Sequence, residues 1–294
     1  MTMPKISFEF FPPRSEAQQR RFWSTLGCLQ TLDPEYVSMT WGALGTTSQP
    51  SIDILEAMKV DASVPVAAHL TCVGHTQDSI RETISQLEAL GIHRFVALRG
   101  DQPDGANGAG YLQHASELVA ILAENPDRDI SVAAYPELHP ESGTVQDDLH
   151  WLKHKLDHGA QRAITQFFFS ADTFLRFRDK AVAMGIHQEL VPGILPIHDI
   201  DKVCGFSAKC GAQVPDALVK RFKKAKDAES AENCAVDQCA GLIQTLHNEG
   251  VESFHLYTLN QSKLAYRVCH ALKSPVAATA DGATADDAAV GAAA

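Results

Sequence analysis

The stretch ISFEFFPPR, residues 6–14, shows the pattern that decides the fold. Its aromatic and β-branched residues predict a short strand, and the double proline that follows cannot extend a strand ladder. Strand alternation puts Ser7, Glu9 and Phe11 on one face and the other apolar residues on the opposite face. Because a carboxyl group among apolar residues is costly unless it is paired or used, Glu9 is a candidate functional residue.

Seven more short apolar runs follow, and they begin at Tyr36, Pro65, His93, Asp129, Arg162, Glu189 and Ser253. The first seven of the eight runs start about 30 residues apart, with helix-like sequence between them. Such strand–helix units, with strands apolar on both faces, predict a parallel sheet covered by helices. We therefore predict an α/β protein with a (β/α)8 TIM barrel. A doubly wound open sheet is the alternative, although no glycine-rich turn follows the first strand.

Helical stripes fill the gaps between the predicted strands. They comprise Ile80, Ile84, Leu87 and Leu90 before Gly91; Phe174, Phe177, Ala181 and Met184 between Ser170 and Gly185; and Val236, Ala240, Ile243 and His247 before Gly250. The last gap is longer, so we expect an extra helix at residues 215–225, before the last strand. Residues 1–273 are expected to form a single catalytic barrel. The Ala-rich residues 274–294 are expected to be a disordered tail.

The composition of the chain limits which classes of partner are expected and in which compartment the protein is expected. Lys and Arg total 25 against 36 Asp and Glu, which argues against nucleic acid or an anionic membrane as a partner. No apolar run approaches the roughly 18 residues of a membrane span, and the N-terminus lacks a signal-peptide pattern. The seven cysteines contain no C-x-x-C pair, and the 13 histidines show no metal-ligand spacing. A cytoplasmic protein with reduced thiols and without a metal centre is expected.

Polar residues late in the apolar runs mark the expected site, because barrel active sites lie at the carboxyl ends of the strands. They are Glu9, Thr40, His69, Arg99, Asp101, Tyr135, Glu137, His139, Gln166, Tyr257 and Asn260. In an apolar barrel mouth, desolvation favours the protonated form of Glu9, which would then be a proton donor. The alternative is a structural ion pair of Glu9 with Arg14 or Arg99.

Four weaker signals leave alternatives open. Gly100 would let a ligand ring approach the backbone beside Asp101, or the two could belong to a simple turn. Residues 105–110, GANGAG, fit a flexible connector better than a phosphate loop. Asp148, Trp151 and Lys155 share one helix face that could hold a phosphate or be solvated. The buried amide of Gln166 could contact a ligand or a structural partner. Together these residues suit a flat organic ligand with a polar edge.

Seven stretches taken together resemble the methylenetetrahydrofolate reductase family of the bacterial type: SFEFFPPR, HLTC, ALRGD, SVAAYPELHPE, RAITQFFF, PGILP and FHLYTLN. The resemblance implies a (β/α)8 barrel with non-covalent FAD, which NADH, or NADPH, would reduce. The flavin would then reduce 5,10-methylenetetrahydrofolate to 5-methyltetrahydrofolate for methionine synthesis, in a ping-pong scheme. It also implies a homo-oligomer.

Roles for individual residues follow from the same resemblance. It makes Glu9 the general acid that opens the five-membered ring of the folate, and Asp101 a catalytic residue that tunes the flavin. It assigns substrate contacts to Gln166, Gln261 and Phe206, with Phe206 in the loop after PGILP. The implied FAD-contacting positions are Thr40, His69, Leu98, Arg99, Gly100, Asp101, Tyr111, His114, Ala133, Tyr135, His139, Asp148, Trp151 and Lys155. Arg99 and Lys155 are expected near the pyrophosphate.

Three features depart from the family pattern. Gln261 stands where relatives carry arginine, which would weaken a contact with the folate tail. Trp151 replaces a smaller amide residue, and a longer loop after Asp101 lets either Tyr111 or His114 fill a tyrosine position. Two other functions fit the sequence: a flavin-free folate reductase with direct hydride transfer, and a non-catalytic barrel that binds folate or a protein.

Overall fold

The computed structural model describes residues 3–40, 49–100 and 110–273. The predicted catalytic residue Asp101 and the predicted tail, 274–294, lie outside the described residues. The strands are β1 (Lys5–Phe10), β2 (Val37–Met39), β3 (Val66–Thr71), β4 (Arg94–Leu98), β5 (Asp129–Ala134), β6 (Arg162–Thr165), β7 (Glu189–Val191), β8 (Gly193–Ile194) and β9 (Ser253–Tyr257). They form one parallel sheet in the order β7-β6-β5-β4-β3-β2-β1-β9-β8.

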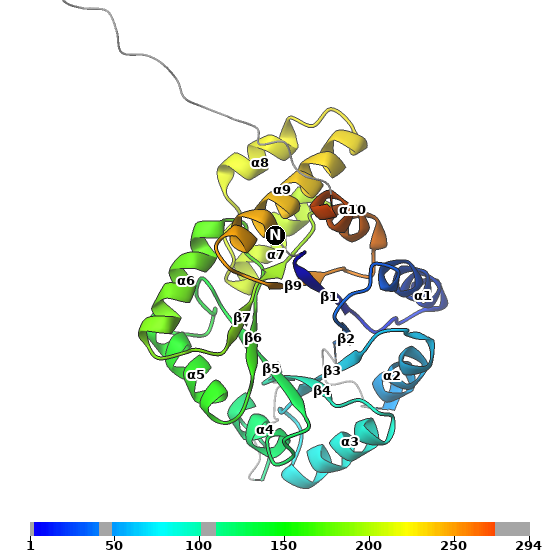
Figure 1. The fold of residues 1–294 in the computed structure, drawn as a ribbon, viewed down its shortest axis with the longest axis vertical. Coiled ribbons are helices and arrows are strands. Elements are labelled where there is room, and N and C mark those ends of the chain that lie inside the picture. Colours follow the sequence, from blue (N-terminus) through cyan, green and yellow to red (C-terminus); the bar gives the residue numbers. More distant parts are fainter. Residues whose placement is uncertain (1–2, 41–48, 101–109, 274–294) are drawn as a thin grey trace, which may run out of the picture.

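The sheet closes on itself through one run of sequence (Figure 1). Its two end strands, β7 and β8, are separated only by Pro192, so β7 pairs with β6 while β8 pairs with β9. The carbonyl of Pro192 still accepts the backbone N–H of His255 at 2.9 Å. The predicted (β/α)8 barrel is therefore confirmed, and the open doubly wound sheet was wrong. Each of the eight predicted runs supplies a strand, and the seventh run is divided in two by its proline.

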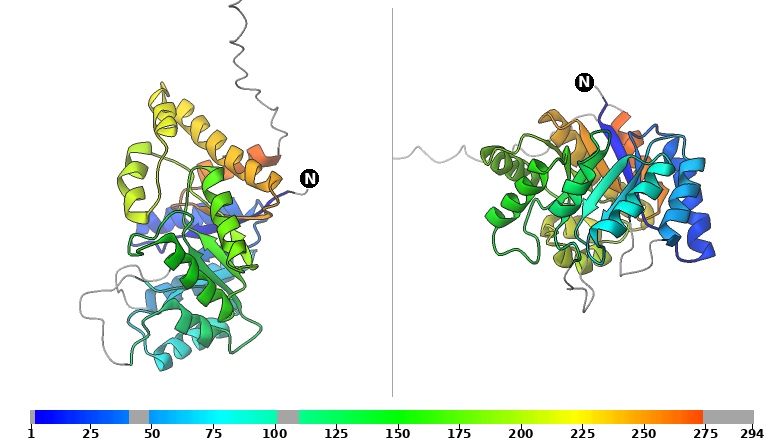
Figure 2. Two further views of the ribbon diagram at one scale, coloured as in Figure 1. Left: turned by 90° about the vertical axis from the view of Figure 1, so that its left-hand side faces the viewer. Right: turned by 90° about the horizontal axis from the view of Figure 1, so that it is seen from below.

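Helices surround the sheet on its outer side, as Figures 1 and 2 show. They are α1 (Glu16–Gln30), α2 (Gln49–Asp61), α3 (Gln77–Ala89), α4 (Ala115–Leu122), α5 (Val145–Asp157), α6 (Ala171–Ala183), α7 (Ile200–Ser207), α8 (Asp216–Lys223), α9 (Ala228–Asn248) and α10 (Ser262–Lys273), with a 3₁₀ helix at Ala208–Cys210. The predicted stripes are confirmed: Ile80, Ile84 and Leu87 of α3 are buried, for example. No helix among the described residues combines the length and the apolar character needed to cross a bilayer.

The segment between β8 and β9 holds more structure than the sequence indicated. The expected extra helix is present as α8, but α7 and the 3₁₀ helix were not predicted. Phe206 therefore lies on α7 and not in a loop. The α7 helix begins at Asp199, whose carboxylate accepts the backbone N–H groups of Asp201 and Lys202. Both α7 and α8 are eight residues long, and only α8 was recognised from the sequence.

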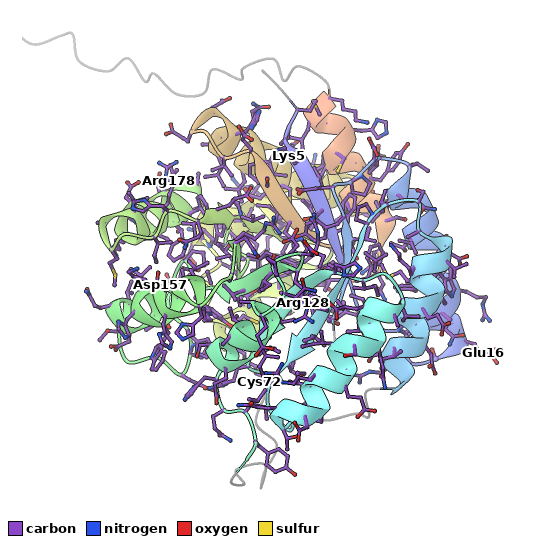
Figure 3. All side chains as sticks on the ribbon, turned by 60° about the horizontal axis from the view of Figure 1, so that its bottom comes forward. Lys5, Glu16, Cys72, Arg128, Asp157 and Arg178 are labelled. Atoms are coloured by element: carbon purple, nitrogen blue, oxygen red, sulfur yellow. The ribbon has the colours of Figure 1, made fainter. Side chains whose placement is uncertain are left out.

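The strand β1 shows how the core is divided. Phe8 and Phe10 are fully buried and point to the helical layer, where the ring of Phe10 meets that of Phe22 edge to face at 5.5 Å. Ser7 and Glu9 occupy the other face, as the alternation predicted. Inside the barrel a small apolar cluster forms from Val96, Ile164, Val191 and Leu98. Charged residues such as Lys5, Glu16 and Asp157 lie at the periphery (Figure 3).

The amino-terminal end of the barrel contains ion pairs. Arg94 and Arg162 both pair with Asp129, and Arg162 also approaches Glu189 at 3.4 Å. These residues begin β4, β5, β6 and β7, so their charges cross-link the starts of four neighbouring strands. The end of a barrel that lacks the catalytic loops is where such stabilising groups are expected.

A test of the closure uses Gly193 on β8. A Cβ atom there would clash with the carbonyl oxygen of Thr165 and would lie 2.7 Å from the ring of Tyr257. We expect Gly193→Ala to lower the free energy of unfolding by about 1–3 kcal/mol, measured by urea denaturation. The matched change Gly241→Ala on α9 meets nothing within 4 Å and should stabilise by about 0.5–1 kcal/mol. Equal free energies of unfolding for the two variants would contradict the close packing of Gly193 against Thr165 and Tyr257.

Candidate active site

A pocket of about 360 Å³ opens where the carboxyl ends of the strands meet. Strand ends or following residues from β1, β2, β3, β4, β5, β6, β8 and β9 contribute to its wall. The predicted site residues that line it are Glu9, Thr40, His69, Leu98, Ala133, Tyr135, Gln166, Phe206 and Tyr257. The structure thus brings together residues from most of the length of the chain at the end where barrel enzymes carry their active sites.

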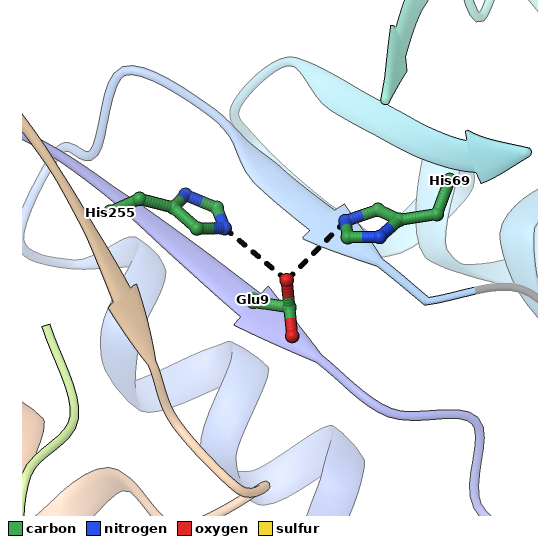
Figure 4. A group of neighbouring side chains, drawn as sticks. All are labelled: Glu9, His69 and His255. Carbon is green, nitrogen blue, oxygen red and sulfur yellow. Dashed lines mark ion pairs between the residues drawn. The ribbon is translucent and has the colours of Figure 1, made fainter. Parts of the chain in front are cut away.

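Glu9 is 7% exposed and lies between two histidines (Figure 4). Its Oε2 atom is 3.5 Å from the Nε2 atom of His69 on β3 and 3.5 Å from the Nε2 atom of His255 on β9. The alternative that paired Glu9 with Arg99 is wrong, because Arg99 pairs with Glu141 at 2.6 Å. Within the described part of the chain, the partners of Glu9 are imidazoles and not a guanidinium.

His255 is completely buried, and its two ring nitrogens differ in their surroundings. Nδ1 lies 2.7 Å from the hydroxyl of Ser7, and that hydroxyl donates to the carbonyl of Phe254 at 3.3 Å. When the Ser7 hydroxyl gives its proton to Phe254, it accepts from Nδ1–H, and the Nε2 lone pair of this tautomer then faces Glu9. Nε2 has no hydrogen-bond partner among the described residues. A proton between Glu9 and His255 would turn this contact of two acceptors into a hydrogen bond.

His69 is 4% exposed and is uncharged at neutral pH. Burial lowers its pKa to about 4, although the charge of Glu9 opposes that shift. Its Nε2 atom also lies 3.1 Å from the hydroxyl of Ser38. Because the imidazole is neutral, His69 contributes a hydrogen-bonding group beside Glu9 and not a counter-ion.

Aromatic rings form one side of the pocket. The ring of Phe167 meets those of Phe206 and Tyr257 edge to face, at centroid distances of 5.8 and 6.4 Å. The hydroxyl of Tyr257 donates to the carbonyl of Thr165 at 2.7 Å, which fixes the ring. Burial and the nearby Glu9 raise the pKa of Tyr257, so it stays a neutral phenol. Rigid flat surfaces of this kind suit a planar ligand.

Gln166 follows β6 and lines the pocket. Its Oε1 atom accepts the backbone N–H of Phe167 at 3.0 Å. The amide therefore has a structural partner on its oxygen, which leaves its NH₂ group as the available donor to a ligand.

Several predicted cofactor positions lie outside the pocket lining: Arg99, Gly100, Tyr111, His114, His139, Asp148, Trp151 and Lys155, together with the substrate position Gln261. Some connect to the pocket wall through one contact. Lys155 donates to the carbonyl of Ala133 at 2.6 Å, and the ring of His139 meets that of Tyr135 edge to face at 4.5 Å. Asp148 accepts the backbone N–H of His139 at 2.8 Å and so fixes the chain after β5.

Local structure explains three of these positions: Gly100, His114 and Trp151. Gly100 has a φ of 85°, and a Cβ there would lie 2.9 Å from the side chain of Thr71, so the backbone itself requires glycine. The half-exposed ring of Trp151 stacks on His114 at 5.6 Å, whereas Tyr111 is exposed. Of the two candidates for the tyrosine position, His114 is the one that contacts Trp151.

Sequence reasoning missed His255. It lies in the stretch SFHLYTLN two residues before Tyr257, so strand alternation already placed both on one face. The signal that could have identified it was a histidine within an apolar strand that lies next to the strand of Glu9 in the barrel.

The fold and the pocket define a TIM-barrel protein with a ligand site at the strand ends and a buried acid within it. Comparison with known proteins gives the family. The sequence pattern of methylenetetrahydrofolate reductase matches residues 2–273. The chain belongs to that family.

Named relatives agree with this assignment. The 5,10-methylenetetrahydrofolate reductase of Pectobacterium carotovorum is 41% identical over 268 residues, which cover 91% of this chain and 89% of that protein. The Escherichia coli protein of the same name is 40% identical, with 91% and 90% covered. A rice protein named "Probable methylenetetrahydrofolate reductase (NADH)" is 32% identical over 88% of this chain and 46% of its own length.

A solved structure supports the fold alone. A Clostridium thermocellum protein described as binding two copies of 5-methyl-5,6,7,8-tetrahydrofolic acid superposes with a TM-score of 0.64 at 17% identity. The match covers 92% of this chain and 94% of that one.

Lys155 provides a pH test of the site's packing. Burial lowers its pKa to about 8 from an ordinary 10.5. Between these values the unfolded chain binds more protons than the folded chain, so this lysine makes stability rise with pH. We expect the free energy of unfolding of the wild type, minus that of Lys155→Met, to increase from pH 8 to pH 10. The matched variant Lys153→Met, which removes a surface pair with Asp157, should show a flat difference in the same urea titrations. A flat difference for Lys155→Met would contradict its burial.

Proposed function

We propose that the protein is a flavin-dependent methylenetetrahydrofolate reductase, which converts 5,10-methylenetetrahydrofolate to 5-methyltetrahydrofolate with NADH, or NADPH, as electron donor. The observation that carries the proposal is Glu9, a buried carboxyl in the pocket of a chain from this family, with no cationic partner among the described residues. Folate reduction needs a proton donor as well as a hydride donor, and this carboxyl is placed to be the former.

The pocket is compatible with FAD as the hydride carrier. Apolar side chains such as Val96, Leu98 and Ile164 lie beside the polar groups of Thr40 and His69, which suits a flat ring with a polar edge. Arg99 and Lys155 are the residues we propose for the pyrophosphate, with Tyr135, His139 and Asp148 ordering the chain after β5. When bound, FAD would supply the hydride for folate and accept one from the nicotinamide.

Glu9 would act on the five-membered ring of the substrate. A carboxylic acid proton given to one ring nitrogen breaks the bond from that nitrogen to the bridging carbon and leaves this carbon as an iminium on the other nitrogen. His255 orients the acid from one side, and Ser7 fixes the ring of His255 through Nδ1. Neutral His69 lies on the other side of the carboxyl, with its Nε2 atom 3.5 Å from Oε2 of Glu9.

Substrate positioning falls to the aromatic side and to Gln166. The pterin ring is flat, so Phe206 and Tyr257 offer stacking surfaces while the NH₂ group of Gln166 donates to its polar edge. Since the nicotinamide ring is also flat, both substrates can use one surface in turn, as the ping-pong scheme requires. Each of the seven cysteines is a free thiol, which suits the cytoplasm as the proposed compartment. A homo-oligomer and a supply of methyl groups for methionine synthesis belong to the same proposal.

The absorption spectrum of the purified protein tests the cofactor. We expect a yellow protein whose oxidised-flavin band disappears when NADH is added without oxygen, and returns when methylenetetrahydrofolate is added. Colourless protein that stays inactive with added FAD would contradict the proposal. Colourless protein that still reduces folate with NADH would favour the flavin-free alternative.

Glu9→Gln tests the acid. The amide keeps the shape of the side chain but cannot donate the proton, so we expect folate reduction to fall about 10²–10⁴-fold. Reduction of the flavin by NADH, followed by stopped-flow absorbance, should stay within about 3-fold, since that half-reaction needs no proton from Glu9. Glu88→Gln on α3, remote from the pocket, is the matched control and should reduce folate normally. Intact turnover in Glu9→Gln would remove Glu9 as the acid.

A further inference from the structure

Glu9, His69 and His255 form a cluster of three potential metal ligands. They come from β1, β3 and β9, and all three side chains are buried. The Oε2 atom and the two Nε2 atoms lie within 4.8 Å of one another. The side chains converge on the carboxylate from either side (Figure 4).

The donor distances favour one coordination geometry. Two ligands with bonds of about 2.0–2.1 Å to a tetrahedral zinc ion lie about 3.4 Å apart. Neighbouring ligands of an octahedral ion with similar bonds lie only about 2.9 Å apart. Each imidazole nitrogen is 3.5 Å from the Glu9 oxygen, so these two distances match the tetrahedral spacing.

The chemistry of the three groups also fits zinc. Two imidazoles and one glutamate are a known set of protein ligands for a zinc ion with one open position. The Nε2 atom of His255, fully buried and without a partner among the described residues, points at Glu9. Its Nδ1 atom contacts Ser7, which is the kind of second bond that orients a metal-binding histidine. Glu9 and His69 line the pocket, so an ion can enter from it and keep its open position there.

We infer that this cluster binds Zn²⁺ in place of the proton between Glu9 and His255, and that zinc is therefore an inhibitor of the acid. A proton or a zinc ion between Oε2 of Glu9 and Nε2 of His255 removes the repulsion between these two acceptor atoms. The proton and the ion therefore cannot be bound at the same time. The inhibition rests on the proposed function, because it needs Glu9 to be the proton donor. The binding of zinc does not rest on it.

Surface histidines are the main competing site. His150 and His154 of α5 and the residue that caps this helix, His158, follow one another at four-residue spacing, and the rings of His154 and His158 are 4.1 Å apart. Such pairs bind divalent metals on helix surfaces. The double variant His154→Gln/His158→Gln therefore serves as the matched control for any histidine-dependent binding.

The binding test uses the flavin-free protein with Co²⁺ as a coloured substitute for Zn²⁺. We expect one equivalent to give the intense visible bands of tetrahedral cobalt, which Zn²⁺ then abolishes by displacement. Ser7→Ala should weaken binding about 10–100-fold, as loss of such a second bond does. Glu9→Gln and His255→Gln should weaken it at least as much, and the α5 double variant should bind like the wild type. Circular dichroism checks that each variant is folded.

Several outcomes would overturn the site. These are unchanged cobalt bands in folded Glu9→Gln and Ser7→Ala, loss of the bands in the α5 double variant, or a thiolate-to-cobalt charge-transfer band that assigns the ion to a cysteine. With the binding established, zinc should abolish folate reduction and spare NADH-dependent reduction of the flavin. Zinc that binds at the cluster yet leaves folate reduction intact would refute the proposed role of Glu9 and the inhibition, but not the site.

Discussion

The site depends on one constraint: a carboxyl group that is removed from water must share a proton or a cation with its neighbours. Glu9 meets this constraint with two imidazoles and no guanidinium. A fixed cation favours the ionised form of a neighbouring carboxyl, and no Lys or Arg among the described residues pairs with Glu9. The same arrangement makes the group open to competition by a metal, so the features that suit an acid also create a vulnerability.

The ion pairs that stabilise the barrel and the pocket lie at opposite ends of its axis. Arginines and carboxylates pair with full charge at the amino-terminal end, where Arg162 and Asp129 meet. At the other end Ser7, His255 and Tyr257 make hydrogen bonds around the pocket, and the ion pair of Arg99 with Glu141 lies outside the pocket lining. Both ends draw their residues from the same strands, so a strand such as β1 contributes apolar rings to the helical layer and an acid to the pocket.

The sequence was most informative where the signal was local. Each strand was visible as an apolar run, and Glu9 was noticeable because it interrupts one. His255 was not singled out, because its meaning depends on Ser7 and Glu9 at the opposite end of the chain, which only closure of the sheet brings beside it. Phe206 was assigned to a loop from the family resemblance, whereas it lies on α7. Local pattern had marked Arg99 at a strand end and Asp148 with Lys155 on one helix face, but their FAD contacts came from family resemblance. Lys155 hydrogen-bonds a strand carbonyl.

The interruption of the seventh run at Pro192 has a consequence for catalysis. The carbonyl of Pro192 accepts the backbone N–H of His255, so the segment that closes the barrel also fixes the position of this imidazole along the barrel axis. Proline has no amide hydrogen to donate, and its φ angle is fixed. The backbone between β7 and β8 therefore has little conformational freedom. The hydrogen bond that closes the barrel wall therefore also determines how far His255 lies from the carboxyl of Glu9.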